Sequence, residues 1–204
     1  SITTALPADP SQANAIWEGF QGSNLPLLAH ALVMGLGGFV VIRGISSIEK
    51  VNKILIPSLL LVLIVSLVKA LSLEGSELGL SYLFTPDWAT LKEPEIWLEA
   101  LTQNAWDTGA AWGLILTYAA YMRKTDDVTV TAFQTGIGNN VVSLIAAIII
   151  FSTVFGTLSP TMGSGEILDV MKTSGPASTG LTFIWMPQLF ATMGGGGIFA
   201  ILFF

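Results

Sequence analysis

Four apolar runs divide the sequence, and each is about as long as a helix that crosses a bilayer. They cover about residues 25–42, 54–73, 97–122 and 128–156. Crossing about 30 Å of hydrocarbon takes roughly 20 apolar residues in a helix. A fifth run starts near Gly195 and is still apolar at Phe204, the last residue. Because a chain in lipid must satisfy its backbone hydrogen bonds internally, these runs predict an all-α, polytopic membrane helix bundle.

The composition supports a membrane protein and excludes some classes of binding partner. Only 11 % of the residues are charged and the mean hydropathy is +0.71, whereas charged residues make up about 25 % of a soluble domain. The formal net charge of -6 argues against nucleic acid as a partner. The sequence contains no cysteine, so disulfides and thiolate metal sites are absent. The partner that this composition requires is a lipid bilayer.

Basic residues are concentrated in two of the connecting loops. Arg43, Lys50 and Lys53 lie between the first and second runs, and Arg123 and Lys124 lie between the third and fourth. By the positive-inside rule these two loops are cytoplasmic. The extracellular segments are then 1–24, 74–96 and 157–194.

The outer segment before the third run carries signals of a short helix. Thr85 precedes Pro86, and the apolar residues Leu91, Ile96 and Leu98 follow. This arrangement predicts a short surface helix.

The outer segment 157–194 is long and predicts two further short helices. Ser164 and Glu166 are placed to cap the first, and Pro187 begins or bounds the second. A hairpin of this length is either a lid or a passive connection between two spans.

An aspartate interrupts the third run near its middle. Asp107 lies in the stretch WDTGAAWG, beside Thr108, Gly109 and Gly113. An unpaired carboxylate at the bilayer midplane costs at least about 2.5 kcal/mol, so it needs a cation, a proton or hydrogen-bond donors. The small neighbours predict a break in the helix, which is tolerated at this depth where it lines a cavity or meets protein. Close helix packing would explain the glycines but not Asp107.

The fourth run carries polar residues at a similar depth. Asn139 and Asn140 lie near its middle, and Ser143 is one turn beyond Asn139 on the same face. Asn139 offers a neutral oxygen and Asp107 a charged one, and both are hard ligands. Gln103 lies one turn before Asp107 and faces the same junction. The sequence therefore predicts a sodium ion between the third and fourth runs.

A series of motifs in this chain resembles the neurotransmitter:sodium symporter family, and specifically its prokaryotic amino-acid transporters. The motifs are RGIS at 43–46, KILIP at 53–57, YLFTPDWATLKEPEIWLEAL at 82–101, TYAAYMRKTDD at 117–127, Asn139, and GLTFIWMPQLF at 180–190. They occur in the family's order along nearly the whole chain. The resemblance implies part of an inverted-repeat transporter fold with discontinuous helices, from the family's fourth helix to the start of its eighth.

The same resemblance implies partners and a location. The remaining helices of a full-length transporter would complete the fold, and the segment 157–194 would act as the extracellular lid. The protein would be a multi-pass protein of the cell membrane, specifically the bacterial inner membrane.

The resemblance also implies roles for single residues. Asp107 and Asn139 fall on positions that ligate the first sodium ion in the family. Trp106 falls where an aromatic residue closes over the substrate, Trp112 where another ring lines its side-chain pocket, and Tyr121 on the cytoplasmic gate. The substrate-binding segment as a whole would comprise Trp106, Asp107, Gly109, Ala110, Ala111, Trp112 and Gly113.

Three positions bear on the counter-ion. In the family's chloride-dependent members, residues at the positions of Gln103, Asp107 and Ser143 hold a chloride ion. Gln103 and Ser143 are neutral, whereas Asp107 carries a fixed charge that would replace the anion. The resemblance therefore implies chloride-independent transport, with proton antiport if Asp107 takes up a proton once sodium leaves.

The leading function is thus a sodium-coupled symporter of amino acids that works by alternating access, and not an enzyme. The glycine-rich MGGGG at 193–197 lacks the Lys-Ser/Thr of a phosphate loop. Two other classes are an ion channel lined by Asp107 and Asn139 and a non-transporting membrane sensor or scaffold. The two tryptophans allow either a small substrate in a filled pocket or an aromatic one that stacks on them.

Overall fold

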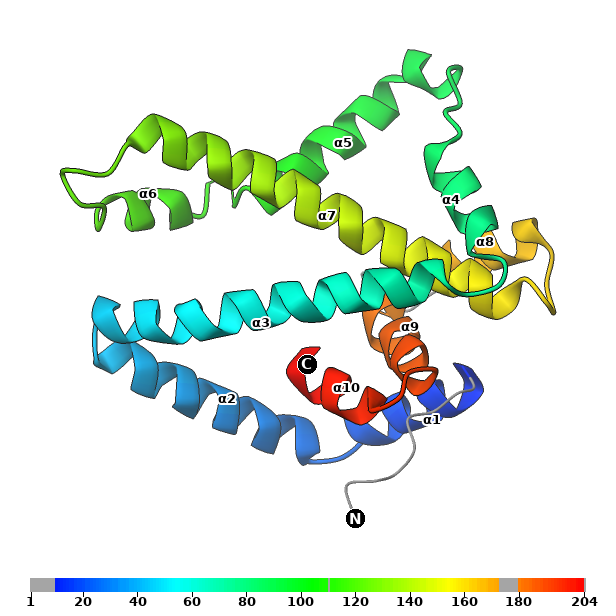
Figure 1. Cartoon of the computed structure of the whole chain (residues 1–204), viewed down its shortest axis with the longest axis horizontal. Coiled ribbons are helices and arrows are strands. Elements are labelled where there is room, and N and C mark those ends of the chain that lie inside the picture. The colour runs from blue at the N-terminus through cyan, green and yellow to red at the C-terminus, as the bar shows by residue number, and fades with distance from the viewer. Residues whose placement is uncertain (1–9, 110, 173–179, 204) are drawn as a thin grey trace. The chain divides into compact units, whose positions relative to one another are not determined.

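The computed structural model describes residues 10–109, 111–172 and 180–203, and every regular element in these ranges is a helix (Figure 1). The fold class expected from the sequence, all-α, is therefore confirmed. The elements are α1 (Pro10–Gln21), α2 (Leu25–Ile42), α3 (Ile45–Leu71), α4 (Ser76–Phe84), η1 (Thr90–Lys92), α5 (Pro94–Asp107), α6 (Leu114–Ala119), α7 (Val128–Leu158), α8 (Ser164–Lys172), α9 (Gly180–Ala191) and α10 (Gly196–Phe203).

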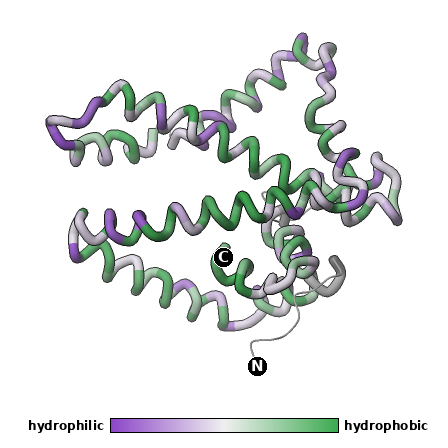
Figure 2. Tube along the Cα trace, in the orientation of Figure 1, coloured by the Kyte–Doolittle hydropathy of each residue, from purple (hydrophilic) through white to green (hydrophobic). Residues whose placement is uncertain are grey.

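Three of the described helices, α2, α3 and α7, are long and apolar enough to cross a membrane. Their most apolar windows have mean hydropathies of 2.1, 2.6 and 2.4, with at most two charged residues in each. Figure 2 shows apolar residues along most of these helices and hydrophilic residues at the turn between α2 and α3. No buried residue lies in α2. An apolar helix without a buried residue is suited to lipid or to further protein.

The turn between α2 and α3 is tight and carries a basic residue. Gly44 has a φ of +80°, a conformation that glycine adopts without steric cost. The Arg43 guanidinium lies 4.2 Å from the centre of the Phe39 ring. The helix α3 begins at Ile45 rather than near position 54 and contains Pro57. The apolar run thus marked only part of the helix, because charged residues such as Lys50 extend its first turns.

The helix α7 is continuous over 31 residues. It begins where the sequence predicts, because the Asp127 side chain accepts a hydrogen bond from the Val130 N–H at 3.1 Å and caps the first turn. Its residues from 128 to 144 are exposed, whereas most residues from Ile149 to Leu158 are buried or half-buried.

The chain divides into two compact units, Ser1–Tyr82 with Leu144–Phe204, and Leu83–Ser143. The core of the first unit is built where α9 contacts α3 and α10. Val62, Ile149, Met186, Leu189 and Phe190 are almost fully buried in it.

A glycine allows a close contact between α4 and α7 in this unit. A Cβ atom on Gly79 of α4 would lie 2.5 Å from the Phe151 carbonyl oxygen of α7. One turn further along α4, Tyr82 stacks on the rings of Phe151 and Phe155 at 5.8 and 6.0 Å. The absent side chain lets the two backbones approach, and the aromatic rings then cover the contact.

The outer segments differ in part from the prediction. In α8 the Glu166 carboxylate accepts a hydrogen bond from the Gly163 N–H at 3.1 Å, so Glu166 caps the helix as predicted. Ser164 is the first residue of α8 rather than its cap. Pro187 does not begin or bound a helix as predicted but lies inside α9. A proline removes one helical hydrogen bond, which the packing of α9 in the core offsets.

The segment 74–96, before the third apolar run, also differs from the prediction. Instead of one surface helix around Leu91 to Leu98, it contains the short η1, and α5 begins at Pro94. Proline suits this first helical position because its missing N–H has no partner there anyway. The helix α4 was not predicted. Residues 173–179 of the expected lid lie outside the described residues.

Candidate functional site

The third apolar run does not form one helix. It is divided into α5, which ends at Asp107, and α6, which begins at Leu114. Between them Gly109, Ala111 and Gly113 have positive φ angles of 62°, 66° and 70°. The discontinuous helix predicted from this stretch is therefore confirmed. Ala110, one of the predicted site residues, lies outside the described residues.

The conformation of Ala111 is the unexpected feature of the break. A left-handed conformation costs an L-residue about 1–2 kcal/mol because of its Cβ atom. Of the described residues other than glycine, only Ala111 adopts it. The run of small residues in GAAWG is the sequence signal that could have indicated a break near this position.

Local hydrogen bonds close the two helix ends. The N–H groups of Thr108 and Gly109 donate to the carbonyls of Asn104 and Trp106, which finishes α5. The Thr117 N–H donates to the Gly113 carbonyl at 2.9 Å, which starts α6. The carbonyls of Asn104 and Trp106 at the end of α5 thus each accept a hydrogen bond from the residues of the break.

The Asp107 carboxylate is held by its own helix. Gln103 Nε2 donates a hydrogen bond to Asp107 Oδ1 at 3.1 Å, across one turn of α5. Both side chains are exposed. Among the described residues no lysine or arginine forms an ion pair with Asp107. The carboxylate therefore has acceptor capacity left for a cation or a proton.

Two tryptophans meet across the break. Trp106 lies in the last turn of α5, and Trp112 directly precedes Gly113. Their ring centres are 5.1 Å apart and their planes are at 85°, so the rings are in edge-to-face contact. Both residues remain largely exposed, at 67 % and 62 %.

The other predicted site residues lie on separate elements. Asn139 and Ser143 lie in the exposed part of α7, one turn apart. No hydrogen bond joins either of them to Asp107 in the described parts of the chain. Tyr121 follows the end of α6, is 62 % exposed, and donates its backbone N–H to Tyr118. The structure thus brings together Gln103 with Asp107, and Trp106 with Trp112.

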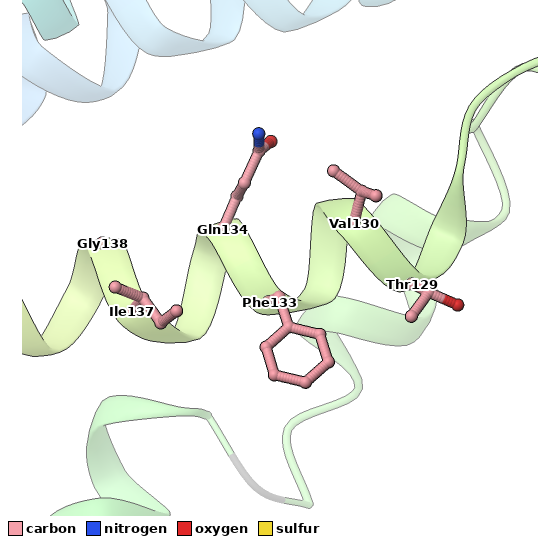
Figure 3. A pocket seen from close by; sticks show the side chains of 6 residues that line it. All are labelled: Thr129, Val130, Phe133, Gln134, Ile137 and Gly138. Carbon is pink, nitrogen blue, oxygen red and sulfur yellow. The ribbon is translucent and has the colours of Figure 1, made fainter.

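A surface hollow runs beside the first turns of α7. Its lining residues all belong to this helix and are Thr129, Val130, Phe133, Gln134, Ile137 and Gly138 (Figure 3). Figure 3 shows Gln134 and Phe133 pointing to opposite sides of the helix. Polar groups do not converge there, so the hollow lacks a feature that binding sites share.

Comparison with known proteins finds similarity to sodium-dependent transporters. A sequence model described as the Sodium:neurotransmitter symporter family matches residues 21–204. The chain is 31 % identical over its whole length to an uncharacterized sodium-dependent transporter of Methanocaldococcus jannaschii. It is 29 % identical, over 97 % of its length, to the sodium-dependent serotonin transporter of Drosophila melanogaster. Over 55 % of its length it is 38 % identical to the sodium-dependent neutral amino acid transporter B(0)AT3 of Mus musculus.

These relatives are considerably longer than the region of similarity. The chain spans 42 % of the Methanocaldococcus protein, 32 % of the Drosophila protein and 18 % of the mouse protein.

Proposed function

Because this chain belongs to the sodium:neurotransmitter symporter family, we propose that the protein is a sodium-coupled symporter of amino acids that works by alternating access. Supporting this, one relative is named as a sodium-dependent transporter of neutral amino acids. Three described helices have the length and hydropathy of membrane spans. We place the protein in the cell membrane, and specifically in a bacterial inner membrane.

The observation that carries the proposal is the break at residues 108–113 with Asp107 at its edge. Broken helices form the ion and substrate sites of many secondary transporters, and this family is itself one of the examples of that rule. The Asp107 carboxylate forms no ion pair with a described residue, and a charged group at membrane depth needs a cation or a proton.

In this proposal sodium is bound by Asp107 and Asn139. The carboxylate supplies a charged oxygen and the amide a neutral one, which suits a hard cation. The bond from Gln103 would orient the carboxylate, so that one oxygen is held while the other faces the ion.

The substrate would bind along the broken segment, next to the sodium ion. Its amino group needs acceptors, and a backbone carbonyl that already accepts one hydrogen bond, such as that of Trp106, can accept a second. Its side chain would lie near Trp106 and Trp112. The lining would also include Gly109, Ala110, Ala111 and Gly113. Tyr121, beyond the end of α6, would belong to the cytoplasmic gate.

We further propose that transport does not require chloride. The charge of Asp107 balances that of sodium inside a low-dielectric site, where a cation and a carboxylate attract each other strongly. Gln103 and Ser143 are neutral and cannot supply this charge. After sodium leaves, a proton taken up by Asp107 would restore the balance and would be carried back as antiport.

The experiment is uptake of a radiolabelled amino-acid mixture by the full-length protein in liposomes. An inward sodium gradient should drive accumulation of label, and an equal potassium gradient should not. Saturation with substrate concentration is expected, because each transport cycle moves a bound substrate. Accumulation that does not depend on sodium would overturn the proposal. Conductive flux that does not saturate would instead favour a channel.

A further inference from the structure

Three polar side chains in the core of the first unit have no hydrogen-bond partner among the described residues. They are the Ser152 hydroxyl of α7 and, in α9, the Trp185 indole N–H and both polar atoms of the Gln188 amide. These residues are 0 %, 2 % and 3 % exposed. Buried polar groups in folded proteins nearly always have a partner, which is either protein or ordered water. The three side chains therefore require a partner other than the residues that surround them.

The two polar residues of α9 lie on one face of that helix. Gln188 follows Trp185 by three residues, a spacing at which the side chains of a helix are neighbours. Leu189, directly after Gln188, is also almost fully buried. The amide of Gln188 and the N–H group of Trp185 are thus placed to share one small ligand.

Ser152 lies on the face of α7 that packs against α9. It is three residues from Ile149 and three from Phe155, so the three side chains lie on one side of the helix. Ile149 belongs to the same buried cluster as Leu189, and Phe155 belongs to the same cluster as Trp185. These two apolar clusters flank Ser152, which places it at the interface between α7 and α9.

The hydrogen-bonding capacity of the three groups selects the ligand. An indole N–H can only donate, a hydroxyl can donate or accept, and an amide does both through separate atoms. A cation would find only two side-chain oxygens there and would face N–H donors. An anion would be buried without a positive charge, since no charged side chain is buried in the described part of the chain. Water can donate to some of these groups and accept from the others.

We propose that ordered water binds between α7 and α9, where it joins Ser152, Trp185 and Gln188 by hydrogen bonds. Because these residues are almost fully buried, a side chain from elsewhere in a full-length transporter cannot reach them unless α9 moves away. The site lies on α9, in the outer segment 157–194, and it does not depend on the proposed transport function.

The direct test is a crystal structure of the full-length protein at a resolution that shows ordered water. At least one water molecule is expected within hydrogen-bond distance of the Gln188 amide and of either Ser152 or Trp185. Another side chain bound in this position, or a Gln188 amide without a neighbouring water, would overturn the inference.

A double-mutant cycle tests the same site in detergent solution. Gln188→Met replaces the amide with an apolar side chain of similar length, and Ser152→Ala removes the hydroxyl. Each should lower the melting temperature of the full-length protein by about 2 °C or more, because hydrogen bonds to the water are lost. The double variant should lose less than the sum of the two, because both residues hold the same water.

Thr153→Val is the matched control for Ser152→Ala. Thr153 is as fully buried as Ser152, but its hydroxyl already donates to the Ile149 carbonyl at 2.7 Å. When Thr153→Val is combined with Gln188→Met, the two effects on the melting temperature should therefore add.

Two outcomes of the cycle would overturn the inference. One is a higher melting temperature for Gln188→Met, since removal of an amide that has no partner relieves the cost of burying it. The other is full additivity between Gln188→Met and Ser152→Ala. If the double variant does not fold, the crystal structure of the wild type decides between a hydrated site and a dry one.

Discussion

Gln103 donates a hydrogen bond from Nε2 to Oδ1 of Asp107, at 3.1 Å and across one turn of α5. An ionised carboxylate offers about four acceptor positions on its two oxygens. The bond therefore fixes the orientation of the carboxylate without saturating it. In the proposed sodium site this makes Gln103 a positioning residue, which acts on the ion through Asp107.

Gln103→Leu should weaken sodium binding to the full-length transporter by roughly three- to tenfold, because the substitution removes this donor. The measurement is the sodium concentration that gives half-maximal binding of labelled substrate. Gln134→Leu is the control, since the same change is made at an exposed glutamine of α7. Equal sodium dependence in both variants would contradict a positioning role for Gln103.

Asn139→Ala should also raise the sodium concentration needed for half-maximal substrate binding, because it removes a neutral ligand oxygen. Asn140→Ala is the matched control. The two asparagines are adjacent in α7, and consecutive residues of a helix point about 100° apart. If Asn140→Ala has the larger effect, the ligand has been assigned to the wrong asparagine.

Gly113→Ala should destabilise the break. Gly113 has a φ of +70° and open space around its Cα atom, so the cost is conformational and about 1–2 kcal/mol. Gly138→Ala should instead stabilise the protein, because Gly138 lies inside α7 with similar open space and alanine favours a helix. The measurement is the melting temperature of each full-length variant in detergent, compared with that of the wild type. Shifts of the melting temperature in the same direction would contradict this account.

Gly79→Ala should lower the melting temperature, because its new methyl group would meet the Phe151 carbonyl. Displacement of a packed backbone costs roughly 1–3 kcal/mol, which exceeds the gain in helix propensity. Gly35→Ala in α2 provides the comparison, since nothing lies within 4 Å of its added Cβ atom. A variant at Gly79 as stable as the one at Gly35 would show that α4 does not pack on α7 this closely.

The sequence predicts those features that depend on local chemistry. Asp127 supplies a cap, so the start of α7 at Val128 could be predicted from neighbouring residues alone. The break after Asp107 was predicted because a carboxylate and several small residues interrupt an apolar run. By contrast, the start of α3 at Ile45 was missed, because hydropathy indicates contact with lipid rather than the ends of a helix.

Features that depend on packing between distant residues could not be predicted. Pro187 was expected at a helix end, yet it lies inside α9, among residues buried against α3 and α10. The contact between Trp106 and Trp112 depends on the φ angles of the break, and a positive φ at Ala111 runs against the usual preference of alanine. Whether Asn139 meets Asp107 in the assembled transporter stays a prediction.

The most direct test of the proposed role of Asp107 is the chloride dependence of transport. Sodium-driven amino-acid uptake by the full-length protein in liposomes is measured in chloride and in gluconate, for the wild type and for Asp107→Ser. We predict that the wild type transports equally in both media, because its fixed carboxylate already balances the charge of sodium. The variant should be weak in gluconate and partly restored by chloride. A wild type that requires chloride would contradict the account.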